Sequence, residues 1–216
     1  MEIGVHEAAL RIGVSDRRAR AMLAAGQIPA RQLAGRWLVE EANLPRSRAL
    51  ARPMSPRMAW AFIGFLSGEI PRVAPSELSR LRHKREQLLA AAEAPLLLRS
   101  WLPRRAERCA LSIAPNDLPE LCTDFRVLLS GISDARSQLS AAGAAELYVT
   151  RRDLEVLRRD YLLSSLGRPN LIAHVVDRPL PPATPLVLVV ADLADHDRPR
   201  EDQRTVELLR AATRSW

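Results

Sequence analysis

The spacing of apolar residues at the start of the chain predicts two short helices that pack against each other. Small or apolar side chains recur every three or four residues in 6–12 and again in 16–25, so each segment has one apolar face. Gly13 permits a sharp turn between the segments, Ser15 is a favourable N-cap for the second, and Gly26 ends it. With the apolar faces packed together, the charged side chains of the second helix point elsewhere.

Two short apolar stretches, 30–33 and 36–39, follow this helix pair and are predicted to form β-strands joined at Gly35. A helix, a turn, a second helix and a hairpin in this order predict a winged helix-turn-helix. In such a unit the second helix enters the major groove of DNA, where its N-terminal residues meet base edges. The alternative interpretation is a helical hairpin whose charged face is only solvated.

Five short pieces of this segment carry a resemblance: Glu7-Ala8-Ala9, Gly13-Val14-Ser15, Gly26-Gln27-Ile28-Pro29-Ala30, Gly35-Arg36-Trp37 and Leu38. They resemble the excisionase-like branch of the MerR-type winged helices, a family that includes excision factors and transcription repressors. In that family the Gly-Val-Ser turn opens the recognition helix, and the Gly-Arg-Trp hairpin is a wing beside the DNA. The resemblance implies base or phosphate contacts from the helix and the wing, namely from Ser15, Asp16, Arg17, Arg18, Arg20, Arg31 and Arg36.

Positive charge is concentrated in the same part of the chain. The whole chain has a net charge of +7, and residues 1–58 hold ten arginines against five acidic residues, so the rest is close to neutral. A basic segment on a predicted helix-turn-helix is the pattern expected for phosphate binding. Lys84 is the only lysine, so the arginine count also reflects a general preference for arginine over lysine.

Prolines and arginines in 45–58 predict a linker that ends in a helix start at Ser55 and Pro56. Three helices are expected next, over 56–66, 75–92 and 96–101. The basic stretch 80–85 in the second of them is interpreted as a solvated helix face rather than as a DNA contact.

From about residue 105 the pattern predicts alternating strands and helices. Strands are expected over 109–113, 126–129, 145–149, 170–176 and 186–190, and helices over 115–123, 150–163 and 200–212. Thr150 is expected to cap the second of these helices. The last strand is predicted because its apolar run is too short for a buried helix. The predicted fold class is α+β, with a winged helix-turn-helix in 1–47, a linker and helical section in 48–104, and a mixed α/β domain in 105–216.

The second half carries another resemblance, in residues 126–135, 145–149, 170–175 and 190–193 together with Pro199 and Arg200. These pieces resemble the antitoxin component of AbiE-like type IV abortive-infection operons, whose toxin is nucleotidyltransferase-like. In that family a winged N-terminal domain represses the operon and the C-terminal domain serves the antitoxin function. The resemblance implies two partners, the double-stranded DNA of an operator and a toxin protein encoded nearby. A separately folded second half also offers a surface for a homodimer.

No catalytic constellation is evident in the sequence. Asp124, Glu146 and Asp192 could supply the carboxylates of a metal-dependent nuclease, but Lys84 lies far from them along the chain. The sequence contains no phosphate-binding loop and no glycine-rich dinucleotide turn. We therefore expect no catalytic residues, no bound metal and no cofactor.

Histidines and cysteines are also interpreted as structural. His174 lies within a predicted strand and is expected to be a satisfied core residue. His196 lies among three aspartates in 192–197, which we interpret as a solvated acidic loop that caps the next helix rather than as a metal site. Cys109 and Cys122 lack the spacing of a zinc site and are expected to be buried core thiols that do not form a disulfide.

No apolar run approaches the roughly 18 residues that a membrane-spanning helix needs, so we expect a cytoplasmic protein at the nucleoid with no membrane partner. The sequence favours a DNA-binding antitoxin and transcriptional autorepressor. A ligand-responsive transcription regulator or an excisionase-like factor is the alternative. A metal-dependent nucleic-acid enzyme is less favoured.

Overall fold

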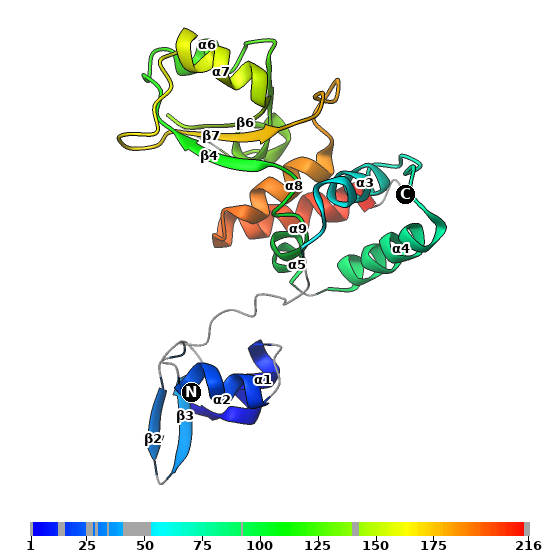
Figure 1. Ribbon diagram of the computed structural model, residues 1–216, viewed down its shortest axis with the longest axis vertical. Helices are drawn as coiled ribbons and strands as arrows, with labels where there is room; N and C mark the ends of the chain where they lie inside the picture. Colours follow the sequence, from blue (N-terminus) through cyan, green and yellow to red (C-terminus); the bar gives the residue numbers. More distant parts are fainter. Residues whose placement is uncertain are drawn as a thin grey trace. The chain divides into compact units, whose positions relative to one another are not determined.

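The computed structural model describes residues 2–12, 16–24, 28, 30–33, 35–40, 53–91, 93–139 and 143–213. The chain forms two compact units, unit 1 over Met1–Arg52 and unit 2 over Pro53–Trp216, which are described separately (Figure 1). The described residues form a mixed α+β structure with one sheet in each unit, which confirms the predicted α+β class. The described parts of the sections 48–104 and 105–216 lie together in unit 2.

Unit 1 contains two helices and a three-stranded antiparallel sheet. Its elements are β1 (Glu2–Gly4), α1 (Val5–Ile12), α2 (Asp16–Ala24), β2 (Ala30–Leu33) and β3 (Arg36–Glu40). The strands lie in the order β1-β3-β2. Sequence analysis predicted both helices and the β2–β3 hairpin at nearly these bounds, but it missed β1, since three residues show no alternating pattern. The predicted turn, cap and helix end at Gly13, Ser15 and Gly26 lie outside the described residues.

The apolar faces of α1 and α2 meet in the core of unit 1. Ala8 and Ala9 on α1 and Ala19 and Leu23 on α2 are buried. The small size of the three alanines lets the two helices approach closely. Trp37 on β3 is half-buried and packs against this core, so it holds the hairpin to the helices. The core is completed by Ile3, Ile28 and Val39.

A four-stranded sheet with the order β4-β7-β6-β5 lies in the middle of unit 2. Its strands are β4 (Glu107–Leu111), β5 (Val127–Leu129), β6 (Ala145–Thr150) and β7 (Leu171–Val176). Strands β6 and β7 are parallel and are connected through α7 (Arg151–Asp160), while the other neighbours are antiparallel. Thr150 caps α7 as predicted, since its hydroxyl accepts a hydrogen bond from the Asp153 amide at 3.1 Å. The short helix α6 (Leu118–Leu121) and α7 cover one face of the sheet (Figure 1).

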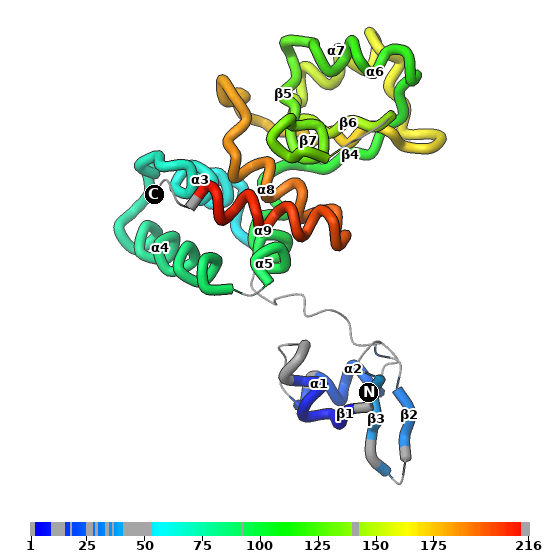
Figure 2. The backbone as a smooth tube through the Cα atoms, turned by 180° about the vertical axis from the view of Figure 1, so that it is seen from behind, coloured from blue at the N-terminus to red at the C-terminus, as the bar shows by residue number. Residues whose placement is uncertain are grey.

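Helices also lie on the other side of the sheet. They are α3 (Pro56–Leu66), α4 (Pro75–Ala90), α5 (Ala94–Trp101), α8 (Leu186–Asp195) and α9 (Pro199–Thr213). Helix α8 lies beside α9 and also packs against α5 (Figure 2). Helix α3 starts as predicted, because the Ser55 hydroxyl accepts a hydrogen bond from the Met58 amide at 3.4 Å and Pro56 occupies the first turn.

The prediction of a strand over 186–190 is wrong, because this segment is the first half of α8. Every residue from 187 to 194 is buried. A helix that is covered on all sides has no polar face, so its sequence lacks the period that distinguishes a helix from a strand. The helix continues beyond the apolar run to Asp195, so it is long enough to be a buried helix.

Side chains alternate along β6 and β7, and this alternation determines which of them lie on each face of the sheet. Leu147 and Ala173 point to the α7 side and join the apolar core there. Glu146, Tyr148 and His174 point to the opposite side and are buried as well. This second face is therefore an interior surface that meets α8, and its polar groups need partners within the protein.

Candidate functional site

The outer face of α2 carries the first group of predicted site residues. Arg17 and Arg20 are exposed, whereas Ala19 and Leu23 on the same helix are buried. Asp16 is half-buried, and its carboxylate oxygens lie 3.2 Å from Nδ1 of His6 at the start of α1. This contact links the first turn of α2 to α1. Helix α2 thus presents two arginines, one turn apart, on one exposed face.

The hairpin carries the second group of predicted site residues. Arg31 on β2 is exposed. Gly35 turns the hairpin with a φ of 77°, a left-handed backbone conformation that favours glycine. Ser15 and the side chains of Arg18 and Arg36 lie outside the described residues. The structure therefore places Arg17, Arg20 and Arg31 on the surface of unit 1.

A buried set of polar side chains in unit 2 joins the sheet to α8. Its members come from the loop before β4, the turn after β5, strands β6 and β7, and the second half of α8. We call this set the buried cluster. It consists of Arg105, Ser130, Glu146, Tyr148, His174 and Asp192, with Asp195 and His196 at its edge.

Asp192 on α8 is the centre of one half of the buried cluster. Its Oδ1 accepts hydrogen bonds from Nη2 of Arg105 at 2.6 Å and from the Tyr148 hydroxyl at 2.7 Å. Its Oδ2 accepts one from the Ser130 hydroxyl. Arg105 also pairs with Asp195, one turn later on α8. Burial raises the pKa of the Asp192 carboxyl, and the nearby positive charges oppose this only in part.

Glu146 on β6 is the centre of the other half. Its Oε1 lies 2.8 Å from Nε2 of His174, and its Oε2 lies 2.8 Å from Nε2 of His196. Burial would raise the pKa of Glu146, but the hydrogen bonds from both histidines lower it to about 2. Burial also works against protonation of His196, yet the contact with Glu146 raises the pKa of this histidine. Gly131 borders the carboxylate, because a Cβ at this position would stand 1.9 Å from Oε2 of Glu146.

The contacts within the buried cluster tie elements of the fold together. The Ser130 hydroxyl donates to Asp192, whereas both histidines bind Glu146, so hydroxyl and imidazole are not paired as nucleophile and base. Of the three carboxylates considered for a nuclease, Glu146 and Asp192 lie in this cluster, while Asp124 pairs with Arg126. Within the described ranges, no group of three or more His, Cys, Asp or Glu side chains is arranged to hold a metal ion.

The sequence predicted the surroundings of some of these residues correctly and of others wrongly. His174 is a buried, hydrogen-bonded core residue, which confirms the prediction. The predicted acidic loop at 192–197 is wrong, because Asp192 is buried within α8, which is longer than its apolar run. Cys109 and Cys122 are free thiols, as expected, but they are half-buried rather than buried. Burial raises the pKa of both thiols.

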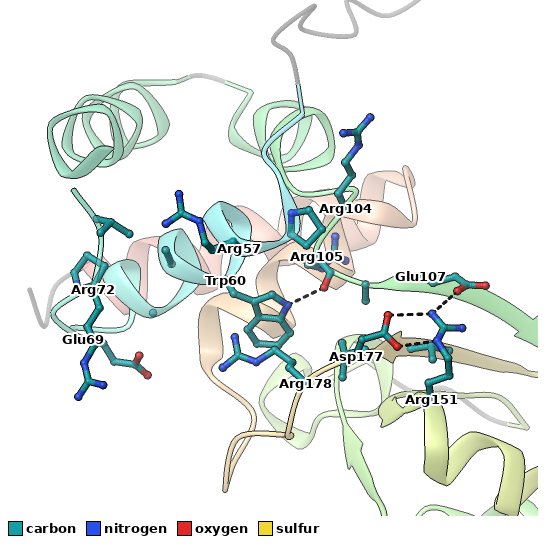
Figure 3. Close-up of a pocket in the computed structure, with 18 of the residues that line it drawn as sticks. Arg57, Trp60, Glu69, Arg72, Arg104, Arg105, Glu107, Arg151, Asp177 and Arg178 are labelled. Atoms are coloured by element: carbon teal, nitrogen blue, oxygen red, sulfur yellow. Dashed lines mark hydrogen bonds and ion pairs between the residues drawn. The ribbon is translucent and has the colours of Figure 1, made fainter. Parts of the chain in front are cut away.

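A cavity of about 880 Å³ opens on unit 2 beside the buried cluster (Figure 3). We call it the arginine pocket. Trp60 of α3 lies in its wall, where the indole Nε1 donates to the carbonyl oxygen of Arg105 at 2.8 Å. The Trp60 ring also meets the ring of Tyr148 edge-on, with 6.1 Å between their centroids. The pocket is lined by α3, by Arg151 and by the segments 69–73, 104–107 and 175–178.

Comparisons with known proteins leave the family of this chain open. No protein-family model matches the chain, and no curated protein and no solved structure matches it. The resemblances to the MerR-type winged helices and to the AbiE-like antitoxins therefore rest only on the short sequence segments named for them above. Among the residues that the structure describes, no helix has both the length and the apolar character that crossing a membrane requires.

Replacing Arg105 with methionine should destabilise unit 2 by about 3–5 kcal/mol, because it leaves the Asp192 carboxylate buried without its cation. Urea unfolding of the full chain, followed by circular dichroism, measures this loss. Arg151→Met is the matched control, since Arg151 forms exposed ion pairs with Asp177 and Glu107, and it should change stability little. Equal losses in the two variants would show that the buried cluster is not what holds unit 2 together.

The contact between Glu146 and His196 should make the stability of unit 2 depend on pH. The pKa of His196 is raised from 6.5, so its contribution is complete below pH 6.5 and is lost as pH rises through the folded-state pKa. The pKa of Glu146 is lowered from 4.5 to about 2, so its contribution is complete above pH 4.5 and is lost as pH falls toward 2. The contact therefore stabilises the fold most between pH 4.5 and 6.5.

His196→Asn tests this window. Unfolding free energies of the native chain and the variant are compared near pH 5.5 and again at alkaline pH, about 9. We expect a larger difference between the two proteins at the lower pH. A difference that is the same at both pH values would mean that protonated His196 does not stabilise the fold through Glu146.

Proposed function

We propose that the chain is a sequence-specific DNA-binding regulator, in which unit 1 is a winged helix-turn-helix and α2 is its recognition helix. One observation carries this proposal: Ala19 and Leu23 of α2 are buried in the core shared with α1, while Arg17 and Arg20 are exposed. A helix that is held by its apolar face to a partner helix can lay its opposite face in the major groove.

Arginine suits this position because its guanidinium group donates two parallel hydrogen bonds to a guanine edge or to a phosphate. Arg17 lies in the first turn of α2, where a recognition helix meets bases, and Arg20 lies one turn further on. The β2–β3 hairpin with exposed Arg31 is the proposed wing. Following the first resemblance, the proposed interface is completed by Ser15, Asp16, Arg18 and Arg36.

A single unit of this size reaches few phosphates. We therefore propose that a homodimer binds two half-sites of an operator, spaced by about one helical turn, roughly 34–36 Å. The arginine excess of residues 1–58 adds a sequence-independent attraction to DNA that salt weakens. The proposed place of action is the cytoplasm, at the nucleoid. An excisionase-like factor would use the same interface.

Alanine at both Arg17 and Arg20 should weaken binding to the DNA upstream of the chain's own gene by tenfold or more, because each lost bidentate base contact costs about 1–3 kcal/mol. Both side chains are exposed, so the melting temperature should not change. Arg168→Ala, at an exposed arginine of unit 2, is the control. Full affinity of the double variant in a gel-shift titration would refute the placement of the recognition helix.

A second role is favoured by an apolar surface on unit 2. Phe125 is 94% exposed and Leu162 is 82% exposed, which is unusual for side chains of this size. Arg126 donates to Asp160 at 2.6 Å, so the turn before β5, which holds Phe125, lies beside the end of α7, which precedes Leu162. Large exposed apolar side chains on this part of unit 2 favour a protein-binding surface. We propose that this surface binds the nucleotidyltransferase-like toxin that the second resemblance implies, which would make the chain an antitoxin and autorepressor.

We further propose that the chain acts by binding rather than by catalysis. The carboxylates of Glu146 and Asp192 are engaged by His174, His196 and Arg105 within the protein. Groups that are held in this way support the packing of the sheet on α8. They are poorly placed to activate water or a metal ion for attack on a nucleic acid.

Co-expression of the full chain with the product of the adjacent gene tests the antitoxin role by rescue of growth. Aspartate at both Phe125 and Leu162 should abolish rescue without unfolding the protein, because both residues are exposed. Ile70→Asp, at another exposed apolar residue of unit 2, is the control and should rescue. Alanine at Arg17 and Arg20 should also leave rescue intact. Rescue that survives the aspartates, or that requires the two arginines, would contradict this role.

A further inference from the structure

We propose that the arginine pocket of unit 2 binds a small organic anion with a flat, apolar body and a carboxylate or phosphate group. Such a site goes beyond the proposed DNA and toxin interfaces and would function without either. The volume of about 880 Å³ falls within the range of about 300–1,000 Å³ that is usual for small-molecule sites. All of its lining residues belong to unit 2.

Apolar side chains line several parts of the pocket, among them Trp60, Pro71, Val73 and Val175. Trp60 is fixed in place, because its indole nitrogen donates to a backbone carbonyl and its ring packs edge-on against Tyr148. A ring that is already oriented costs little ordering on binding, so it favours a flat ligand. These walls account for the apolar body of the proposed ligand.

Three of the lining arginines already have carboxylate partners. Nε of Arg151 donates to Asp177 at 2.7 Å, and its Nη2 donates to Glu107 at 2.9 Å. Arg57 pairs with Glu77, and Arg105 is held within the buried cluster. These ion pairs fix the outline of the pocket, and the two carboxylates on Arg151 leave one unbalanced negative charge there.

Three other lining arginines lack such a partner. In the described part of the chain, no carboxylate forms an ion pair with Arg72, Arg104 or Arg178. The guanidinium of Arg178 lies over the Trp60 ring, 4.3 Å from its centroid (Figure 3). Glu69 is the one lining carboxylate of the described chain that no arginine holds. These three guanidinium groups outnumber Glu69 and the second carboxylate on Arg151, so a positive charge remains beside an aromatic wall. This favours an anion that accepts hydrogen bonds from the arginines.

Isothermal titration calorimetry of the full chain with three naphthalene probes tests the proposed site. Naphthyl phosphate and naphthoate carry the two anionic groups on the same flat body, whereas naphthol is neutral. We expect at least one of the anions to bind about tenfold more tightly than naphthol, because charge-assisted hydrogen bonds from arginine form only with the anions. The anion that binds more tightly identifies the anionic group of the ligand.

Three variants test whether the anion binds in the arginine pocket. Arg178→Gln should weaken binding of the anion about tenfold, and the exposure of Arg178 leaves the fold unaffected. Glu69→Gln should strengthen it, since the opposing charge is removed. Arg168→Gln, at an exposed arginine outside the pocket, should leave it unchanged. Failure of both anions to bind at millimolar concentration, equal binding of naphthol, or equal affinities of the Arg178 and Arg168 variants would each overturn the proposal.

Discussion

The ion pair between Arg105 and Asp192 is the interaction on which the architecture of unit 2 depends. Asp192 lies on α8 and also receives hydrogen bonds from Tyr148 of β6 and from Ser130 after β5, so four parts of the chain meet at one carboxylate. Desolvation offsets much of the attraction within a buried pair, so the pair adds little net stability. Its effect is to favour this packing, because a compact arrangement in which Arg105 and Asp192 do not meet would leave a charge buried and unpaired.

In unit 1, the sequence predicted most of the described fold and the exposure of Arg17 and Arg20, because both depend mainly on contacts between residues close in sequence. The spacing of Ala19 and Leu23 fixes the buried face of α2, and this alone determines that Arg17 and Arg20 are exposed. Strand β1 escaped prediction because its pairing with β3 is decided by a strand more than thirty residues away, as in the register of Ile3 with Val39. The same local reasoning correctly predicted Thr150 as the cap of α7.

In unit 2 the buried cluster could not be predicted, since its partners are far apart in sequence. Arg105 and Asp192 are 87 residues apart, and nothing local distinguishes Arg105 from the other arginines near it. Glu146 and Tyr148 alternate with apolar residues along β6, a pattern that normally assigns them to solvent. They are buried because α8 covers them. Because the sequence predicted a strand over 186–190, it did not predict the helix that covers this face of the sheet.

The chain thus combines exposed arginines on a helix of unit 1 with a pocket and an apolar surface on unit 2. We propose that α2 of unit 1 binds DNA. Amide hydrogen exchange of the full chain, with and without the duplex upstream of its own gene, would detect this binding at the helix itself. Slower exchange in α2 and in the β2–β3 hairpin when DNA is bound is the predicted result. Unchanged exchange in both elements, whatever happens in unit 2, would contradict it.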